Sequence, residues 1–150
     1  MKIFKMEVKF GNYSIKTRKE NEIISVYDII RKKWIILNAE EQVRQVWIHM
    51  LVYDLHISPS KIAIEKGFRI NDRLKRFDIC VYNKMATPDL LIECKAPNQR
   101  LVPSTIDQIS SYNIYLKCSK FVVTTGIDHL GFVYRENRIS IVKNITELLE

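Results

Sequence analysis

Two short stretches decide how this chain folds: Arg76-Phe77-Asp78-Ile79-Cys80-Val81-Tyr82 and Leu90-Leu91-Ile92-Glu93-Cys94-Lys95. Each is an apolar run of the kind that forms a buried strand, and charged side chains interrupt it. Burying a charge is costly unless a partner or a metal ion compensates it. Asp78, Glu93 and Lys95 therefore form either a compensated ionic cluster or an active site.

The segment between the two stretches, residues 83–88, has the composition of a turn and predicts an antiparallel hairpin. A turn centred between residues 85 and 86 places Asp78 opposite Glu93, with Cβ atoms about 4.5–5.5 Å apart. Lys95 lies two residues beyond Glu93 and therefore projects from the same face of its strand. Asp89 follows a proline, but it lies about 13 Å along the strand from Glu93 and is rejected as a metal ligand.

Two carboxylates at this separation bind Mg²⁺ through oxygen and leave water on the ion, which is what a phosphodiester hydrolase needs. Such an ion polarises the phosphate and lowers the pKa of a bound water, and a nearby lysine can orient that water or stabilise negative charge. The alternative is structural. In that case the two acids are surface-strand residues that Lys95 or Arg76 neutralises.

The composition is that of a soluble globular protein with one domain: 150 residues, 47% hydrophobic and 27% charged. We find no apolar run near the roughly 18–20 residues of a membrane span and no signal peptide, so we expect a cytoplasmic protein without membrane contact. Three cysteines without a motif fit reduced thiols. The three histidines lack zinc-ligand spacing, which argues against a transition-metal site, and we expect no small-molecule cofactor.

Basic residues outnumber acidic ones, 24 to 17, which gives a formal charge of +7. This excess suits a polyanion partner, and we expect DNA. Local concentrations occur at residues 31–33 and 73–76, and the second leads directly into Asp78. A basic surface that serves only solubility is the alternative.

A helix is predicted to begin at Asn38, a good N-cap, with Glu41 three residues later completing a capping box. Apolar residues follow at helical spacing and form one stripe to about residue 55: Val43, Val46, Trp47, Met50 and Leu51. On that helical wheel Glu41 points away from the stripe, whereas Glu40 lies within about 50–60° of its centre. We therefore expect Glu40 to face inward, either favouring the helix dipole or serving as a third acid near the metal.

Residues 62–70, 75–82 and 89–96 predict a three-stranded meander, with the first turn at residues 71–74. That turn would place Gly67 opposite Asp78, leaving room for an ion or a phosphate. Glu65 falls on the same face, diagonal to Asp78, as a weaker additional acid or an edge-strand charge.

The remaining elements are predicted from the same kinds of pattern. A helix from Pro103 to about Lys117 would place Gln108 and Tyr112 on one face. We expect a strand at residues 119–126, a hairpin formed by 131–135 and 138–142, and a short helix at 146–150. The N-terminal strands, within residues 1–30, are the least defined part.

The order helix, three-stranded meander, helix, strand, with acids on the second and third strands, resembles the PD-(D/E)XK, or restriction-endonuclease-like, nuclease superfamily. Phe77 stands where the signature names proline. The closer resemblance is to the N-terminal nuclease domain of type I restriction enzyme R subunits, over about residues 28–135. It rests on residues 31–34, 40–45, 75–79, 92–97 and 107–113.

This resemblance implies that Asp78 and Glu93 bind the metal, with the Cys94 carbonyl as an additional ligand, and that Lys95 is the catalytic lysine. Glu40 would correspond to the acid of the first helix, and the adjacent Glu41 is the alternative. Two further residues match a Gln-x3-Tyr motif placed beside the scissile phosphate: Gln108 and Tyr112.

We therefore expect one α/β domain, residues 1–150, with a restriction-endonuclease-like mixed sheet flanked by helices. Its expected activity is Mg²⁺- or Mn²⁺-dependent hydrolysis of DNA phosphodiesters, as an endonuclease. The sequence is compatible with a homodimer. The alternative is a catalytically inactive nucleic-acid-binding or assembly module with the same fold.

Overall fold

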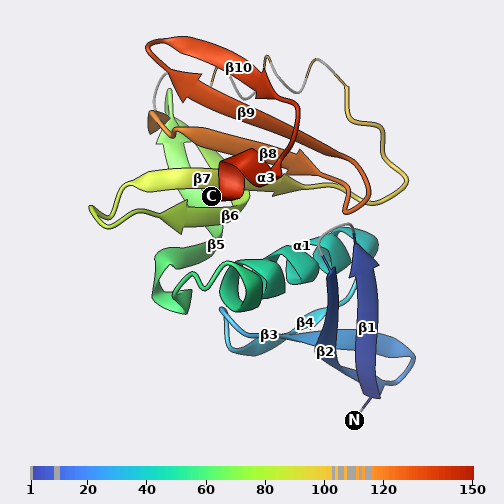
Figure 1. Ribbon diagram of the computed structural model, residues 1–150. Helices are drawn as coiled ribbons and strands as arrows, with labels where there is room; N and C mark the ends of the chain where they lie inside the picture. Colours follow the sequence, from blue (N-terminus) through green and yellow to red (C-terminus); the bar gives the residue numbers. More distant parts are fainter. Residues whose placement is uncertain are drawn as a thin grey trace.

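One helix, α1 (Ala39–His49), lies between two β-sheets in the computed structural model of the chain (Figure 1). The structure describes residues 2–8, 11–102, 104, 107, 111, 113 and 116–150. Helices and strands both contribute, so the predicted mixed α/β class is confirmed. In the described part of the chain, no helix has the length and apolar character needed to cross a membrane.

The N-terminal sheet has four antiparallel strands in sequence order: β1 (Lys2–Val8), β2 (Gly11–Glu20), β3 (Ile23–Asp28) and β4 (Lys33–Ile36). The larger sheet has six strands in the order β10-β9-β8-β7-β6-β5. Its strands are β5 (Ile62–Ile70), β6 (Arg73–Tyr82), β7 (Pro88–Cys94), β8 (Lys120–Thr124), β9 (His129–Arg135) and β10 (Arg138–Val142). Strands β7 and β8 pair in parallel and their neighbours pair antiparallel, so the sheet is mixed.

Helix α1 begins where the sequence predicts. The backbone N–H of Glu41 donates to Asn38 Oδ1 at 2.7 Å, which satisfies a free donor of the first turn. The predicted apolar stripe is buried, with each of its five residues at most 3% exposed. A π-helical turn, η1 (Met50–Asp54), extends the helix, and a 3₁₀ turn, η2 (Pro59–Lys61), leads into β5.

Two hydrophobic clusters form the core, one on each face of the larger sheet. In β7, Ile92 belongs to the cluster that includes the apolar side of α1, while its neighbour Leu91 belongs to the other cluster with Phe121 and Phe132. This alternation follows from the two-residue period of a strand. A strand with both faces covered is uniformly apolar, as β7 is between Leu90 and Ile92.

The predicted register of the β6–β7 hairpin is confirmed. Ile79 pairs with Ile92 and Cys80 with Leu91, as a turn centred between residues 85 and 86 requires. The next residue beyond this pair is Asp78 in β6 and Glu93 in β7. The two carboxylates therefore lie on neighbouring strands, one residue beyond the last pair.

The predicted register of the β5–β6 hairpin is wrong. The turn has two residues, Asn71 and Asp72, and both have positive φ, 48° and 60°. Asn and Asp tolerate this conformation, and such a turn suits the twist of a hairpin better than the longer turn expected. The pairing shifts as a result, so Gly67 lies opposite Arg76 rather than Asp78.

The C-terminal elements follow the prediction closely. Strands β8, β9 and β10 lie within two residues of the expected bounds, and a short helix, α3 (Thr146–Leu149), closes the chain. The expected helix from residue 103 to 117 lies largely outside the described residues. Gln108 and Tyr112 fall there, so their predicted roles stay predictions.

Candidate active site

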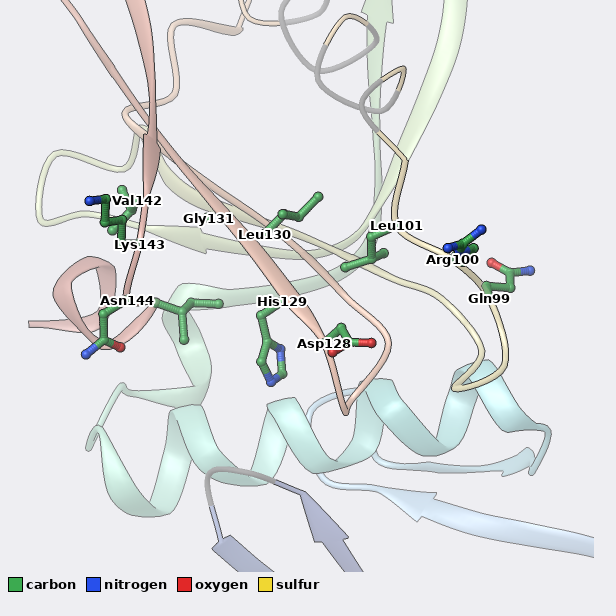
Figure 2. Close-up of a pocket in the computed structure, with 11 residues that line it drawn as sticks. Gln99, Arg100, Leu101, Asp128, His129, Leu130, Gly131, Val142, Lys143 and Asn144 are labelled. Carbon is green, nitrogen blue, oxygen red and sulfur yellow. The ribbon is translucent and has the colours of Figure 1, made fainter.

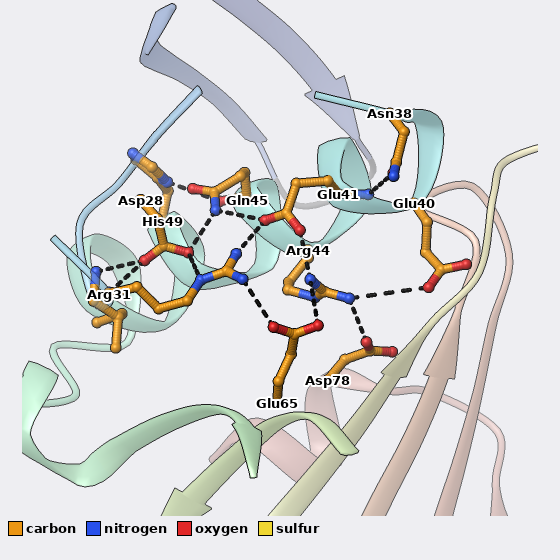
Figure 3. Close-up of polar contacts among 11 residues, drawn as sticks. Asp28, Arg31, Asn38, Glu40, Glu41, Arg44, Gln45, His49, Glu65 and Asp78 are labelled. Carbon is orange, nitrogen blue, oxygen red and sulfur yellow. Dashed lines mark hydrogen bonds and ion pairs between the residues drawn. The ribbon is translucent and has the colours of Figure 1, made fainter. Parts of the chain in front are cut away.

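Asp78 lies near the point where β6 and β7 stop pairing with each other. Their pairing ends at Ile79 and Ile92, and beyond it the Cys94 N–H donates to Asp78 Oδ2 at 2.6 Å. The other oxygen, Oδ1, accepts from Arg44 Nη2 of α1 at 2.5 Å (Figure 3). The Asp78 side chain is 12% exposed, so these two donors replace most of its water.

Glu93 and Lys95 form an ion pair at the end of β7. Lys95 Nζ lies 2.8 Å from Glu93 Oε1, and about a third of each side chain is exposed. The Lys95 backbone N–H donates to the Thr124 carbonyl at 2.8 Å, which fixes this segment against β8. The predicted placement of Lys95 beside Glu93 agrees with this geometry.

Charges around this pair shift the pKa values of both groups. Burial, followed by the negative charge of Asp78, raises the pKa of Glu93, although Lys95 opposes the shift. Burial alone would lower the pKa of Lys95, but the hydrogen bond and charge of Glu93, with smaller effects of Glu40 and Asp78, raise it. Lys95 is therefore an ammonium group at neutral pH.

The expected orientation of the two acids at the start of α1 is wrong. Glu41 is buried, 4% exposed, whereas the Glu40 side chain is 43% exposed. The prediction rested on the apolar stripe alone, but Arg31 before the helix and Arg44 on α1 itself compensate the Glu41 charge and let it face inward. Glu40 nevertheless lies near the site, since its Oε1 is 3.9 Å from Arg44 Nη2. Its negative charge also contributes to the raised pKa values of Glu93 and Lys95.

Arg44 is a residue of this site that the sequence analysis missed. Its Nη1 donates to Glu41 Oε2 at 2.5 Å while its Nη2 donates to Asp78. Arg44 is only 6% exposed, and the charges of Asp78 and Glu41 raise its pKa against the effect of burial. The sequence pattern that could have identified Arg44 is its spacing. It lies three residues after Glu41 and four after Glu40, which places all three side chains on one side of a helix.

Glu65 faces Arg31 and Arg44, and it is not diagonal to Asp78 as predicted. It lies in β5 between residues that pair with Ile79 and Phe77, so it stands opposite Asp78. Its φ of 53° marks a local irregularity in the strand. Its carboxylate lies 3.2 Å from Arg31 Nη1 and 3.8 Å from Arg44 Nη1.

A protein-family model described as type I restriction enzyme R protein N terminus matches residues 39–148. The chain belongs to this family. The family predicted from the sequence is thereby confirmed, and membership indicates a nuclease-related function. No curated protein matches the chain.

The family match begins at α1 and includes Glu40, Asp78, Glu93 and Lys95. The N-terminal sheet precedes it. Asp28 and Arg31 contact the buried side of α1. Both residues therefore lie outside the segment of this R-family chain that the family model matches.

Cys94 could contribute to a metal site through its backbone carbonyl. Burial, followed by the charge of Asp78, raises the pKa of its thiol well above the ordinary value, so the thiol stays protonated. Its N–H donates to Asp78, whereas the N–H of Lys95, which belongs to the same peptide unit as the Cys94 carbonyl, donates to Thr124 of β8. The C=O and N–H of a trans peptide point in opposite directions. The carbonyl is thus directed to the side on which Asp78 lies.

In the described part of this R-family chain, side chains alone do not make a complete metal site. Among the described residues, no three His, Cys, Asp or Glu side chains are grouped so that they could hold one ion. Asp78 and Glu93 supply two carboxylates. Mg²⁺ commonly keeps several waters and takes only one or two carboxylates from the protein, so this donor set fits it.

A cavity of about 600 Å³ lies apart from these carboxylates, and Arg100, His129 and Lys143 are among its lining residues (Figure 2). His129 Nδ1 lies 2.8 Å from Thr124 Oγ1, and the Thr124 carbonyl accepts the Lys95 N–H. The cavity is therefore a neighbour of the site, and neither Asp78 nor Glu93 lines it.

Proposed function

We propose that this chain is a metal-dependent deoxyribonuclease of the PD-(D/E)XK type that cuts DNA as an endonuclease. One observation carries the proposal. The β6–β7 register brings Asp78 and Glu93 to neighbouring positions, and Lys95 Nζ lies 2.8 Å from Glu93 Oε1. In a chain of the type I R family, two carboxylates and a lysine in this arrangement favour phosphodiester hydrolysis.

The arrangement of strands supports a restriction-endonuclease-like fold. Strands β5, β6 and β7 form an antiparallel meander, and β8 then joins β7 in parallel. Helix α1 precedes the meander and packs on one face of it. These elements occur in the order expected for the superfamily.

Asp78, Glu93 and the Cys94 carbonyl would hold Mg²⁺ or Mn²⁺. When bound, such an ion polarises the phosphate and lowers the pKa of a coordinated water. The local charge supports a divalent cation. Five carboxylates face only two guanidinium groups, an excess of three negative charges, and these seven residues are Asp28, Glu40, Glu41, Glu65, Asp78, Arg31 and Arg44.

Lys95 would act directly on the phosphate. As an ammonium group about a third exposed, it can reach the substrate and stabilise the negative charge that develops on the phosphate oxygens. Glu40, half exposed and near the same pair, would adjust the charge of the site. We assign the phosphate contacts to Gln108 and Tyr112 on the family motif alone.

The alternative, an inactive nucleic-acid-binding or assembly module, has one specific observation in its favour. Each proposed ligand already has a cationic partner, Arg44 for Asp78 and Lys95 for Glu93. A site closed in this way would keep the fold and lose the chemistry. The excess of 24 basic over 17 acidic residues suits DNA binding under either function.

Incubation of the purified protein with supercoiled, linear, single-stranded and branched DNA, in Mg²⁺, Mn²⁺ or EDTA, separates the two functions. The nuclease cuts at least one of these substrates when metal is present and none in EDTA. The inactive module binds DNA, with an affinity that falls as salt increases, and cuts none.

A further inference from the structure

Two donors from different parts of the fold hold the Asp78 carboxylate. Arg44 Nη2 donates to Oδ1 at 2.5 Å, and the Cys94 N–H donates to Oδ2 at 2.6 Å. Arg44 is 6% exposed and Cys94 is fully buried. Because water has little access to either donor, the two bonds set the orientation of the Asp78 side chain.

Glu41 in turn orients Arg44. Its Oε2 accepts from Arg44 Nη1 at 2.5 Å, one turn further along the same helix face. Its Oε1 accepts from Gln45 Nε2 at 2.9 Å and from Arg31 Nη2 at 2.5 Å (Figure 3). Both oxygens of Glu41 are thus bonded, and Arg44 has one preferred position between Glu41 and Asp78.

Arg31 carries the network into the N-terminal sheet. Its Nε donates to Asp28 Oδ2 at 2.8 Å, and its backbone N–H donates to Asp28 Oδ1 at 2.6 Å. Asp28 is the last residue of β3 and is fully buried. A continuous chain of ion pairs therefore connects this strand to Asp78, although β3 precedes the matched family region.

We propose that Arg44 and Glu41 are positioning residues for Asp78, and that Arg31 and Asp28 extend this role into the N-terminal sheet. This sheet would then be part of the active site and not an appended module. The significance of Asp78 rests on the proposed nuclease function, whereas the orientation of its carboxylate is a property of the protein without metal.

The chemistry of arginine explains why this role differs from charge compensation alone. A guanidinium donates to two carboxylates at once in a fixed geometry, which a lysine ammonium cannot reproduce. Groups that orient a metal ligand typically change metal affinity or activity about 10–100-fold when they are mutated. A purely structural Arg44 would affect folding and leave the properties of the folded site unchanged.

The first arm of the test uses the Cys94 amide, because it donates to Asp78. Its ¹H–¹⁵N resonance is followed in EDTA, and Asp78→Ala supplies the position for a lost bond. We expect Arg44→Lys and Glu41→Gln to move the resonance toward that position, and Arg31→Lys to move it less. Arg18→Lys is the matched control, since Arg18 lies in the same N-terminal sheet, over Trp34 and paired with Glu20.

The second arm measures Mn²⁺ affinity by calorimetry without DNA. Arg44→Lys should bind Mn²⁺ about 10–100-fold more weakly than the wild type and Arg18→Lys equally well. If Arg44→Lys does not fold, Glu41→Gln and Arg31→Lys supply both readouts.

Three outcomes separate this proposal from the nuclease function. A folded Arg44→Lys with a wild-type Cys94 resonance overturns the positioning role. An unchanged Mn²⁺ affinity, where the wild type binds Mn²⁺, overturns it as well. If the wild type binds no Mn²⁺, the proposed nuclease function fails, and the Cys94 resonance alone decides whether Arg44 positions Asp78.

Discussion

Lys95 Nζ lies 2.8 Å from Glu93 Oε1, two residues apart on the same face of the chain, and both side chains remain about a third exposed. The pair is therefore accessible to a substrate, in contrast to the buried network around Arg44. Its two members have different expected functions. Glu93 would hold the metal, and Lys95 would act on the phosphate.

Replacing Lys95 with alanine should slow the chemical step about 10²–10³-fold, comparable to the loss of one preorganised donor to a transition state. DNA affinity should change little. Single-turnover cleavage of saturating DNA measures the step, and Lys84→Ala, an exposed lysine of the β6–β7 turn, is the matched control. If DNA binding collapses while the saturated rate stays at the wild-type value, Lys95 anchors a phosphate instead.

The raised pKa of Glu93 predicts a pH-dependent effect on stability without metal. Burial and then the charge of Asp78 raise this pKa, so the ionised carboxylate is less stable in the folded than in the unfolded protein. The protonated Glu93 carboxyl stabilises the folded protein. This contribution is fully present below about pH 4.3, the pKa of a glutamate in the unfolded chain, and is lost as pH rises through the raised pKa of the folded protein.

Glu93→Gln removes this ionisation. In EDTA the variant should therefore unfold at a higher temperature than the wild type near pH 8, and the difference should shrink toward about pH 4. Thermal unfolding across this range measures the effect, with the exposed Glu136→Gln as control. A wild type more stable than Glu93→Gln near pH 8 would contradict the prediction.

Gly131 in β9 should not tolerate a larger residue. A Cβ there would lie 2.5 Å from Leu148 Cδ1, and Leu148 of α3 is 2% exposed and cannot move away easily. Gly131→Ala should destabilise the protein by about 1–3 kcal/mol, the usual effect of overpacking. Denaturant unfolding measures it.

Gly67→Ala is the comparison for this change. Its Cβ would meet Leu74 Cδ1 at 2.8 Å, but Leu74 is 59% exposed and can rotate away. We expect a much smaller effect than at Gly131. Equal effects at the two positions would show that α3 does not pack on β9 as described.

Gln108 and Tyr112 lie outside the described residues, so mutations test the role that the family motif implies for them. If they contact the substrate phosphate, Gln108→Ala should reduce cleavage with little loss of stability, and Tyr112→Phe should reproduce much of that reduction. If they only pack, Tyr112→Phe should be nearly silent in both assays. Cleavage rates and unfolding temperatures of the two variants distinguish these cases.

The larger sheet was predictable where local patterns decide the structure. The turn before β7 fixed the pairing of Ile79 with Ile92, and Asn38 fixed the start of α1. The β5–β6 turn was predicted wrongly because two residues with positive φ, Asn71 and Asp72, shorten it. A shift of two residues in that turn moved Gly67 away from Asp78.

The site was predictable only in part, because long-range charge pairing leaves little local signal. Asp78, Glu93 and Lys95 stand out as charges within apolar strands. Glu41 does not, since its inward orientation depends on Arg31, ten residues earlier, and on Arg44 reaching Asp78 across the fold. Periodicity predicts where apolar side chains lie and says little about a buried charge with distant partners.

The most direct test of the nuclease function is plasmid cleavage by Asp78→Ala, Glu93→Ala and Asp89→Ala, each confirmed to be folded. Asp89 is the matched control, an acid of the same strand as Glu93 whose carboxylate is engaged by Ser119 and Lys120. We predict that Mg²⁺-dependent cleavage is lost in the first two variants and retained in Asp89→Ala, because a missing ligand disrupts the ion site. Wild-type cleavage by a folded Asp78→Ala would contradict the assignment.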